Sequence, residues 1–140
     1  MRHLQIFAAT LLAFVALDAA WLVLVAGAFF KSEVGALLRS QPDLAVAAVF
    51  YLIYAGGLAI LAVTPALRER SAKSAIWKGA VLGLSAYATF DLSNLAVIQG
   101  WTRRVTLVDI TWGTIASALA ALAGYLIARQ STVDGQEQLH

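Results

Sequence analysis

Four long apolar runs constrain this chain more than any other feature. They cover residues 4–30, 44–67, 75–100 and 105–128, and all are rich in Ala and Leu. A helix needs roughly 20 residues to cross a hydrocarbon core about 30 Å thick. The runs are continuous rather than alternating, and helices satisfy their backbone hydrogen bonds internally, as lipid requires. The sequence therefore predicts an all-α membrane protein: one domain, residues 1–128, folded as an antiparallel four-helix transmembrane bundle.

The composition agrees with this class of protein. Of the 140 residues 61% are hydrophobic and 13% charged, whereas soluble domains usually have about 45–50% and about 25%. The first run is not expected to be a cleaved signal peptide, because it is too long and has Asp18 in its middle. Residues 129–140 are polar, and we expect a loose C-terminal tail there.

Several kinds of chemistry are excluded or disfavoured. The absence of cysteine rules out disulfides and thiolate metal sites, and the two histidines, His3 and His140, lie at the termini. We therefore expect neither a metal nor a cofactor. The net charge of +2 comes without a basic run, so no nucleic-acid partner is expected. Phosphate-binding glycine loops and nucleophile motifs are also absent from the sequence.

The Lys and Arg residues predict the orientation of the spans. Six would lie on the side of the termini: Arg2, Arg68, Arg70, Lys73, Lys78 and Arg129. Four would lie on the opposite side: Lys31, Arg39, Arg103 and Arg104. The positive-inside rule then places both the N and the C terminus in the cytoplasm.

Small residues mark the expected packing faces. Gly79 and Gly83 form a GxxxG motif in the third run, and Gly113, Ser117 and Ala121 follow at four-residue spacing in the fourth. Such faces let helix backbones approach closely in lipid. We favour packing within the four-helix bundle, and a homodimer through Gly79 and Gly83 is the alternative.

Three carboxylates fall inside the apolar runs: Asp18, Asp91 and Asp109. The only Lys or Arg within these runs is Lys78, which lies near one end of the third run. An isolated ionised carboxylate is costly in lipid, so each should be protonated, hydrogen-bonded or open to water. An ionisable residue at membrane depth is by default a candidate for function.

Depth along the helices places these acids together. With a rise of 1.5 Å per residue, Asp91 lies roughly 13 Å from the face opposite the termini, Asp18 roughly 18 Å and Asp109 about 6 Å. Between about 9 and 15 Å from the same face lie Trp21, Tyr51, Tyr54, Asn94 and Trp112. Tyr87 precedes Asp91 by one helical turn. The sequence therefore predicts one ligand-binding or proton-linked cluster in this half of the bilayer.

Two alternatives accompany this prediction. Polar residues in membrane helices also join helices without any further role, and Tyr and Trp also serve as interfacial anchors.

If Arg103 or Arg104 folds back from the short turn before the fourth run, it would pair with Asp109 or Asp91. That pairing would open a water-accessible cavity toward the face opposite the termini.

Four motifs also resemble a known family. FVALDAAWL, FYLIYAGGLAI, AYATFDLSNLA and TLVDITWGT are similar, in order and spacing, to a family of small, uncharacterised bacterial four-span integral membrane proteins, a predicted membrane domain of unknown function. The resemblance covers residues 4–128 and implies a multi-pass protein of the bacterial inner membrane. The family's characteristic positions correspond here to Asp18, Trp21, Tyr51, Tyr54, Tyr87, Asp91, Asn94, Asp109 and Trp112. The family pattern has Tyr and Thr where this chain has Phe90 and Ser93. Both exchanges are mild, although Phe90 lacks the hydroxyl of a tyrosine.

Three hypotheses for function follow. In the first, the cluster binds or transports a small amphiphile or lipid, Asp91 and Asp18 hold its polar or cationic group, and protonation is linked to release. In the second, the protein is a membrane enzyme that acts on lipid or isoprenoid chains, with Asp91 as general acid or base. In the third, it is a structural subunit of a membrane complex, and the acids only join helices.

Overall fold

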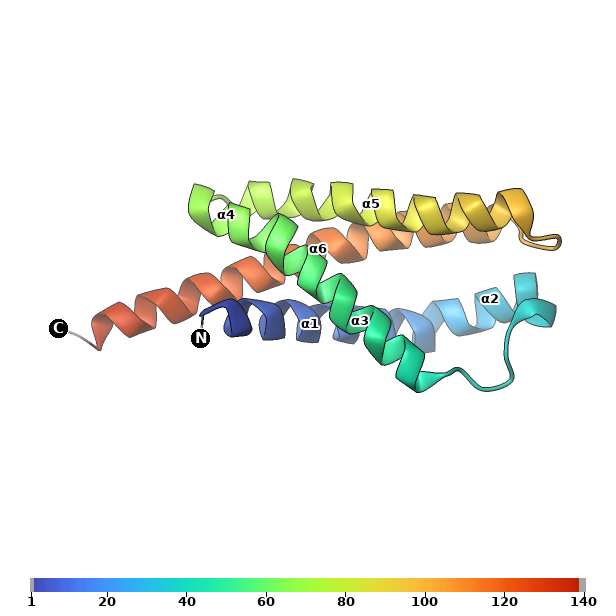
Figure 1. Ribbon diagram of the computed structural model, residues 1–140, viewed down its shortest axis with the longest axis horizontal. Coiled ribbons are helices and arrows are strands. Elements are labelled where there is room, and N and C mark those ends of the chain that lie inside the picture. The colour runs from blue at the N-terminus through green and yellow to red at the C-terminus, as the bar shows by residue number, and fades with distance from the viewer. Residues whose placement is uncertain (1, 139–140) are drawn as a thin grey trace.

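Four long helices, each apolar enough to cross a membrane, form the computed structural model, which describes residues 2–138 (Figure 1). Consecutive spans run in opposite directions, so the two ends of the chain lie at the same end of the bundle. We name this the termini end, and the other, with segments 38–43 and 98–102, the far end. The predicted all-α fold with four spans is confirmed, and residues 2–138 contain no strand.

The first span is one continuous helix made of four parts. It consists of α1 (Arg2–Trp21), a π-helical turn η1 (Leu22–Ala26), α2 (Gly27–Val34) and a final 3₁₀ turn η2 (Gly35–Leu37). In the π turn, the backbone N–H of Gly27 donates to the carbonyl five residues before it. The helix therefore reaches beyond the predicted limit at residue 30 and takes up about half of the polar segment that follows.

The second span contains a similar irregularity. It consists of α3 (Leu44–Leu58), a π-helical turn η3 (Ala59–Val63) and α4 (Thr64–Glu69). Pro65 lacks a backbone N–H, and its ring crowds the preceding turn, so the helix widens just before it. The Thr64 hydroxyl donates to a carbonyl in this widened turn at 2.8 Å. Pro65 therefore changes the helix locally without ending it.

The third and fourth spans are uninterrupted helices, α5 (Ala72–Val97) and α6 (Arg103–Glu137). Each begins at a hydroxyl cap: the side chains of Ser71 and Thr102 accept a backbone N–H three residues on, both at 3.1 Å. The expectation of a loose tail over residues 129–140 is wrong for its described part, because α6 continues to Glu137. No proline interrupts that stretch, so the helix has no reason to stop at the end of its apolar part.

The glycine faces of α5 and α6 pack against each other. A Cβ atom on Gly79 would lie 2.7 Å from the Ser117 backbone oxygen and 2.8 Å from the Ala121 Cβ. A Cβ atom on Gly83 would overlap the Gly113 backbone and the Ser117 side chain. Only glycine permits this approach, so the predicted packing within the bundle is observed. The homodimer through Gly79 and Gly83 involves a second copy and stays a prediction.

The core of the bundle is closely packed in the half nearer the termini end. The core there consists mainly of alanines from η3, α4, α5 and α6, which let the backbones come close together. The side chain of Thr10 in α1 occupies the space where a Cβ on Gly124 would lie, so α1 and α6 also meet closely. Small residues therefore bring the helices close together in this half of the molecule.

The far half is more open, because α3 crosses the other spans obliquely and its N-terminal end lies apart from them (Figure 1). This part of α3 packs mainly on α1. Its apolar side chains are widely exposed, with Leu44 at 75% and Ile53 at 71%, as expected of groups that face lipid. The divergence of α3 leaves space beside α2 and α5.

Replacing Gly83 with Leu should destabilise the fold. The added side chain would collide with the α6 backbone, and overpacking of this kind typically costs about 1–3 kcal/mol. Gly57→Leu is the matched control, because nothing lies within 4 Å of a Cβ at that position. We expect a lower thermal unfolding midpoint in detergent for Gly83→Leu alone. Equal midpoints in the two variants would contradict the close packing.

Candidate functional site

Asp18 of α1 joins three of the four spans. The Tyr51 hydroxyl of α3 donates to Asp18 Oδ2, and the Trp112 Nε1–H of α6 donates to Asp18 Oδ1 at 3.2 Å. Trp21, one turn after Asp18, stacks on Trp112 with ring centroids 4.6 Å apart and planes only 6° from parallel. The carboxylate thus has two donors from neighbouring helices, as a polar group at membrane depth needs.

A second polar contact links α3, α5 and α6. The hydroxyls of Tyr54 and Ser117 lie 2.5 Å apart and share a hydrogen bond. Tyr87 meets Tyr54 edge to face, with 6.1 Å between ring centroids. The Tyr87 ring fills the space that a side chain at Gly113 would need. Tyr54 and Tyr87 are thereby held side by side, and the missing side chain of Gly113 makes room for this arrangement.

The carboxyl of Asp91 has no such partners. Its side chain is fully buried, and neither Oδ1 nor Oδ2 accepts a hydrogen bond from any described residue. The neighbouring group is the carboxyl of Asp109, on α6. Two ionised carboxylates cannot hydrogen-bond each other, so the pair requires a proton or a cation between them.

The arginines that precede α6 do not supply that cation. Arg104 pairs instead with Glu33 of α2 at 3.2 Å, and Arg103 lies exposed at the far end. The expectation that one of them folds back onto Asp109 or Asp91 is therefore wrong. Glu33 offers a partner close to the end of the bundle, where a guanidinium need not enter the apolar interior.

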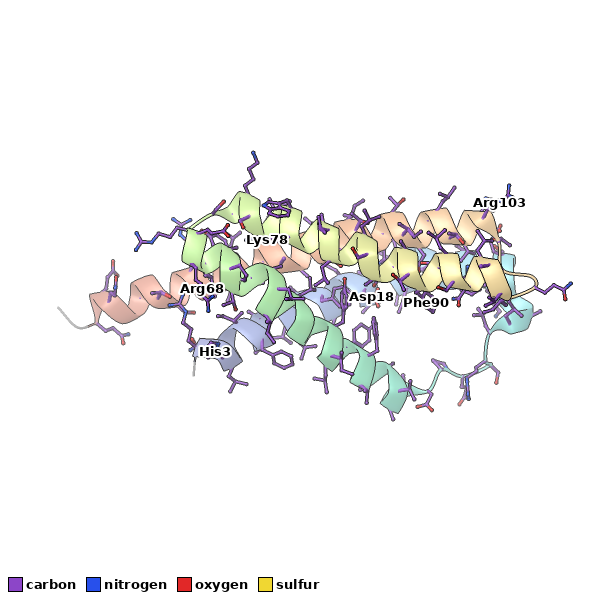
Figure 2. All side chains as sticks on the ribbon, turned by 45° about the horizontal axis from the view of Figure 1, so that its top comes forward. His3, Asp18, Arg68, Lys78, Phe90 and Arg103 are labelled. Atoms are coloured by element: carbon purple, nitrogen blue, oxygen red, sulfur yellow. The ribbon has the colours of Figure 1, made fainter. Side chains whose placement is uncertain are left out.

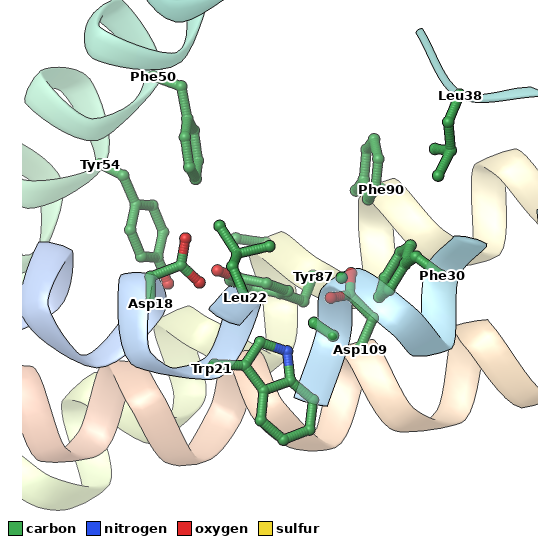
Figure 3. Close-up of a pocket in the computed structure, with 13 residues that line it drawn as sticks. Asp18, Trp21, Leu22, Phe30, Leu38, Phe50, Tyr54, Tyr87, Phe90 and Asp109 are labelled. Carbon is green, nitrogen blue, oxygen red and sulfur yellow. The ribbon is translucent and has the colours of Figure 1, made fainter. Parts of the chain in front are cut away.

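A cavity of about 560 Å³ lies between α3 on one side and α2 and α5 on the other (Figure 3). Its walls are largely aromatic: Trp21, Phe30, Phe50, Tyr54, Tyr87 and Phe90. Two carboxylates also line it, Asp18 from α1 and Asp109 from α6, and Figure 3 shows both on the same side of the space. The cavity thus combines apolar walls with a few polar groups gathered at its floor.

The structure brings most of the predicted residues to this cavity. Five of the nine line it: Asp18, Trp21, Tyr54, Tyr87 and Asp109. Tyr51 and Trp112 lie behind it as the donors to a lining carboxylate. Asp91 adjoins the other lining carboxylate from within the bundle. Asn94 is half-buried farther along α5, does not line the cavity and makes no side-chain hydrogen bond to a described residue.

Other residues of the site were missed in the sequence. The walls include Phe30, Phe50 and Phe90, which cannot be told from lipid-facing aromatics inside an apolar run. Ser117 stood out only as a small packing residue, whereas it also holds the Tyr54 hydroxyl. The four-residue spacing of Ser117 from Gly113 placed it on the packing face of α6, and nothing in that spacing indicated its contact with Tyr54.

Removing the Asp18 carboxylate should destabilise the protein more than neutralising it. Asp18→Leu leaves the Tyr51 hydroxyl and the Trp112 N–H without an acceptor, at a typical cost of about 1–3 kcal/mol. Asp18→Asn, the control, keeps one acceptor oxygen of similar shape and should cost less. Chemical unfolding followed by tryptophan fluorescence measures both. If Asp18→Leu is as stable as the native protein, the hydrogen bonds do not hold the spans together.

A family model with the description "Predicted membrane protein (DUF2177)" matches residues 3–126 of the chain. No match was found among curated proteins or among solved structures. The match covers all four spans up to the last turns of the apolar part of α6. The chain therefore belongs to this family of predicted membrane proteins of unknown function.

Proposed function

We propose that the protein binds a small amphiphile or lipid in the cavity between α3 and α5, and holds or transports it there. The supporting observation is the make-up of the cavity. Its volume of about 560 Å³ falls within the usual 300–1,000 Å³ of ligand sites, which are apolar with a few convergent polar groups. Aromatic walls suit an apolar chain, and the carboxylates and tyrosine hydroxyls of the floor suit a polar head.

The position of the mouth favours a ligand that comes from the membrane. Phe50 of α3 and Phe90 of α5 both line the cavity, yet they are 44% and 54% exposed. Both therefore reach the outer surface of the bundle, and the mouth lies between them. In a bundle that spans a membrane this surface faces lipid, so an amphiphile can enter sideways without crossing water.

The close packing toward the termini end bears on how the protein would work. A core of alanines lies between the cavity and that end, which supports a binding state open to one half of the bilayer. Transport would require a second state. The two π-helical turns are the places to look for such a change, because π-bulges are frequent at functional sites, and Leu22 and Ala26 of η1 line the cavity.

A membrane enzyme that acts on lipid or isoprenoid chains is the second candidate. One observation favours it: the buried Asp91 carboxyl lies beside Asp109, which reaches the cavity. A carboxyl pair of this kind can take up or release a proton next to a bound molecule. Turnover of a lipid substrate that is lost in Asp91→Asn while binding persists would favour the enzyme.

Filling the cavity should abolish binding. Ala86→Trp places a large side chain in the cavity, whereas Leu84→Trp, on the exposed face of the same helix, does not. Native mass spectrometry of the protein extracted from its own membranes should show a discrete bound molecule with the native protein and Leu84→Trp. The same molecule should be absent from Ala86→Trp. Retention by Ala86→Trp, or no bound molecule in any of the three, would contradict the proposal.

A further inference from the structure

We infer that the occupant of the cavity is a hydrophobic cation, an ammonium-type head on an apolar body, which binds at Asp109 and Asp18. This inference rests on the proposed function and names the class of ligand for the same site. It follows from the charges around the cavity, from the aromatic character of the walls and from the buried acid behind the floor.

The charges around the cavity are unbalanced. Asp18 and Asp109 line it, and Asp91 lies directly behind the second of these. No lining residue is basic. The cations of the far end outside an ion pair, Lys31, Arg39 and Arg103, are exposed and do not line the cavity, although Arg39 follows the lining residue Leu38. The lining therefore offers negative charge and no positive charge, which disfavours phosphate or carboxylate heads and favours a cation.

The other ionisable groups facing this region do not restore the balance. Arg104 of α6 and Glu33 of α2 form an ion pair with each other and neutralise one another at the far end. The remaining groups are the phenols Tyr51 and Tyr54 of α3 and Tyr87 of α5. A neutral phenol can donate a hydrogen bond to a carboxylate or to a ligand, but it brings no positive charge.

The walls fit an organic cation better than an inorganic one. Six aromatic side chains surround the space, and the negative faces of aromatic rings attract ammonium groups. A bare metal ion needs several oxygen ligands at close range. No group of three or more His, Asp or Glu side chains suited to a metal occurs among residues 2–138.

Asp91 adds to this excess of acids. It is 0% exposed, neither carboxyl oxygen receives a donor from another kind of side chain or from the described backbone, and its neighbour is the Asp109 carboxyl, so the two acids need a proton or a cation between them. A cation held at Asp109 would neutralise the pair formed by these two acids. Without a ligand, a proton must do so. Ligand and proton therefore compete for the same charge, which gives a cation carrier a route to proton-linked release.

Binding of tritiated decyltrimethylammonium to the detergent-solubilised protein, measured by scintillation proximity, tests this inference. We expect saturable binding that weakens from about pH 8 to about pH 5, because protonation removes the charge that holds the cation. Decanol and decyl sulfate have the same chain with a neutral and an anionic head. They should compete at least about tenfold less well than unlabelled decyltrimethylammonium.

Three variants complete the test. Asp109→Asn should raise the Kd for decyltrimethylammonium at least about tenfold, whereas Asp109→Glu should retain binding. Asp134→Asn removes an exposed acid near the end of α6, far from the cavity, and should leave the Kd unchanged. Thermal unfolding of each variant distinguishes loss of the site from loss of the fold.

The outcomes separate the two proposals. If decanol competes as well as the cation, and Asp109→Asn binds normally, the ligand class is wrong while the cavity proposal stands. If decyltrimethylammonium binds the native protein and Ala86→Trp equally, the cavity is not its site, and both the inference and the proposed function fail. A Kd raised as much by Asp134→Asn as by Asp109→Asn would reduce the effect to general surface charge and overturn the inference.

Discussion

Lipid offers no hydrogen-bond partner to a polar group, and this constraint governs how the chain treats its three intramembrane acids. Asp18 satisfies it within the protein, because Tyr51 and Trp112 reach it from two other spans. The same carboxylate therefore joins α1, α3 and α6 at one depth. Asp91 is treated differently, because its neighbour is another acid, Asp109, and this pair needs a proton or a cation to neutralise it.

The contrast between the two halves of the bundle follows from side-chain size. Toward the termini, alanines and glycines let the helices touch backbone to backbone in the core of the bundle. Toward the far end, large aromatic side chains replace them, and α3 diverges from the bundle (Figure 2). Rings that meet edge to face, such as Tyr54 and Tyr87, hold the helices apart. A cavity lined by rings is the result.

Much of this could be predicted from the sequence, for a simple reason. The rise of a helix is constant, so the number of residues from the end of a span gives the depth of a side chain. Counting in this way placed Asp18, Tyr51 and Trp112 in the same half of the bilayer, and the structure joins them. The same counting placed Asn94 with them, but Asn94 stays apart from the cavity. Depth says nothing about the direction in which a side chain leaves its helix once the helix has rotated against its neighbours.

The sequence by itself determined the number of spans, their helical nature, the small-residue seam between α5 and α6 and the depth of the acids. These depend on local properties: apolar length, helical rise and the four-residue spacing of Gly79 and Gly83. Only the tertiary structure decided that Arg104 pairs with Glu33 rather than with Asp109, that α3 tilts away, and that Phe50 and Phe90 line one cavity. Each of these depends on how the spans are rotated and tilted against one another, which is set by contacts between residues far apart in the chain.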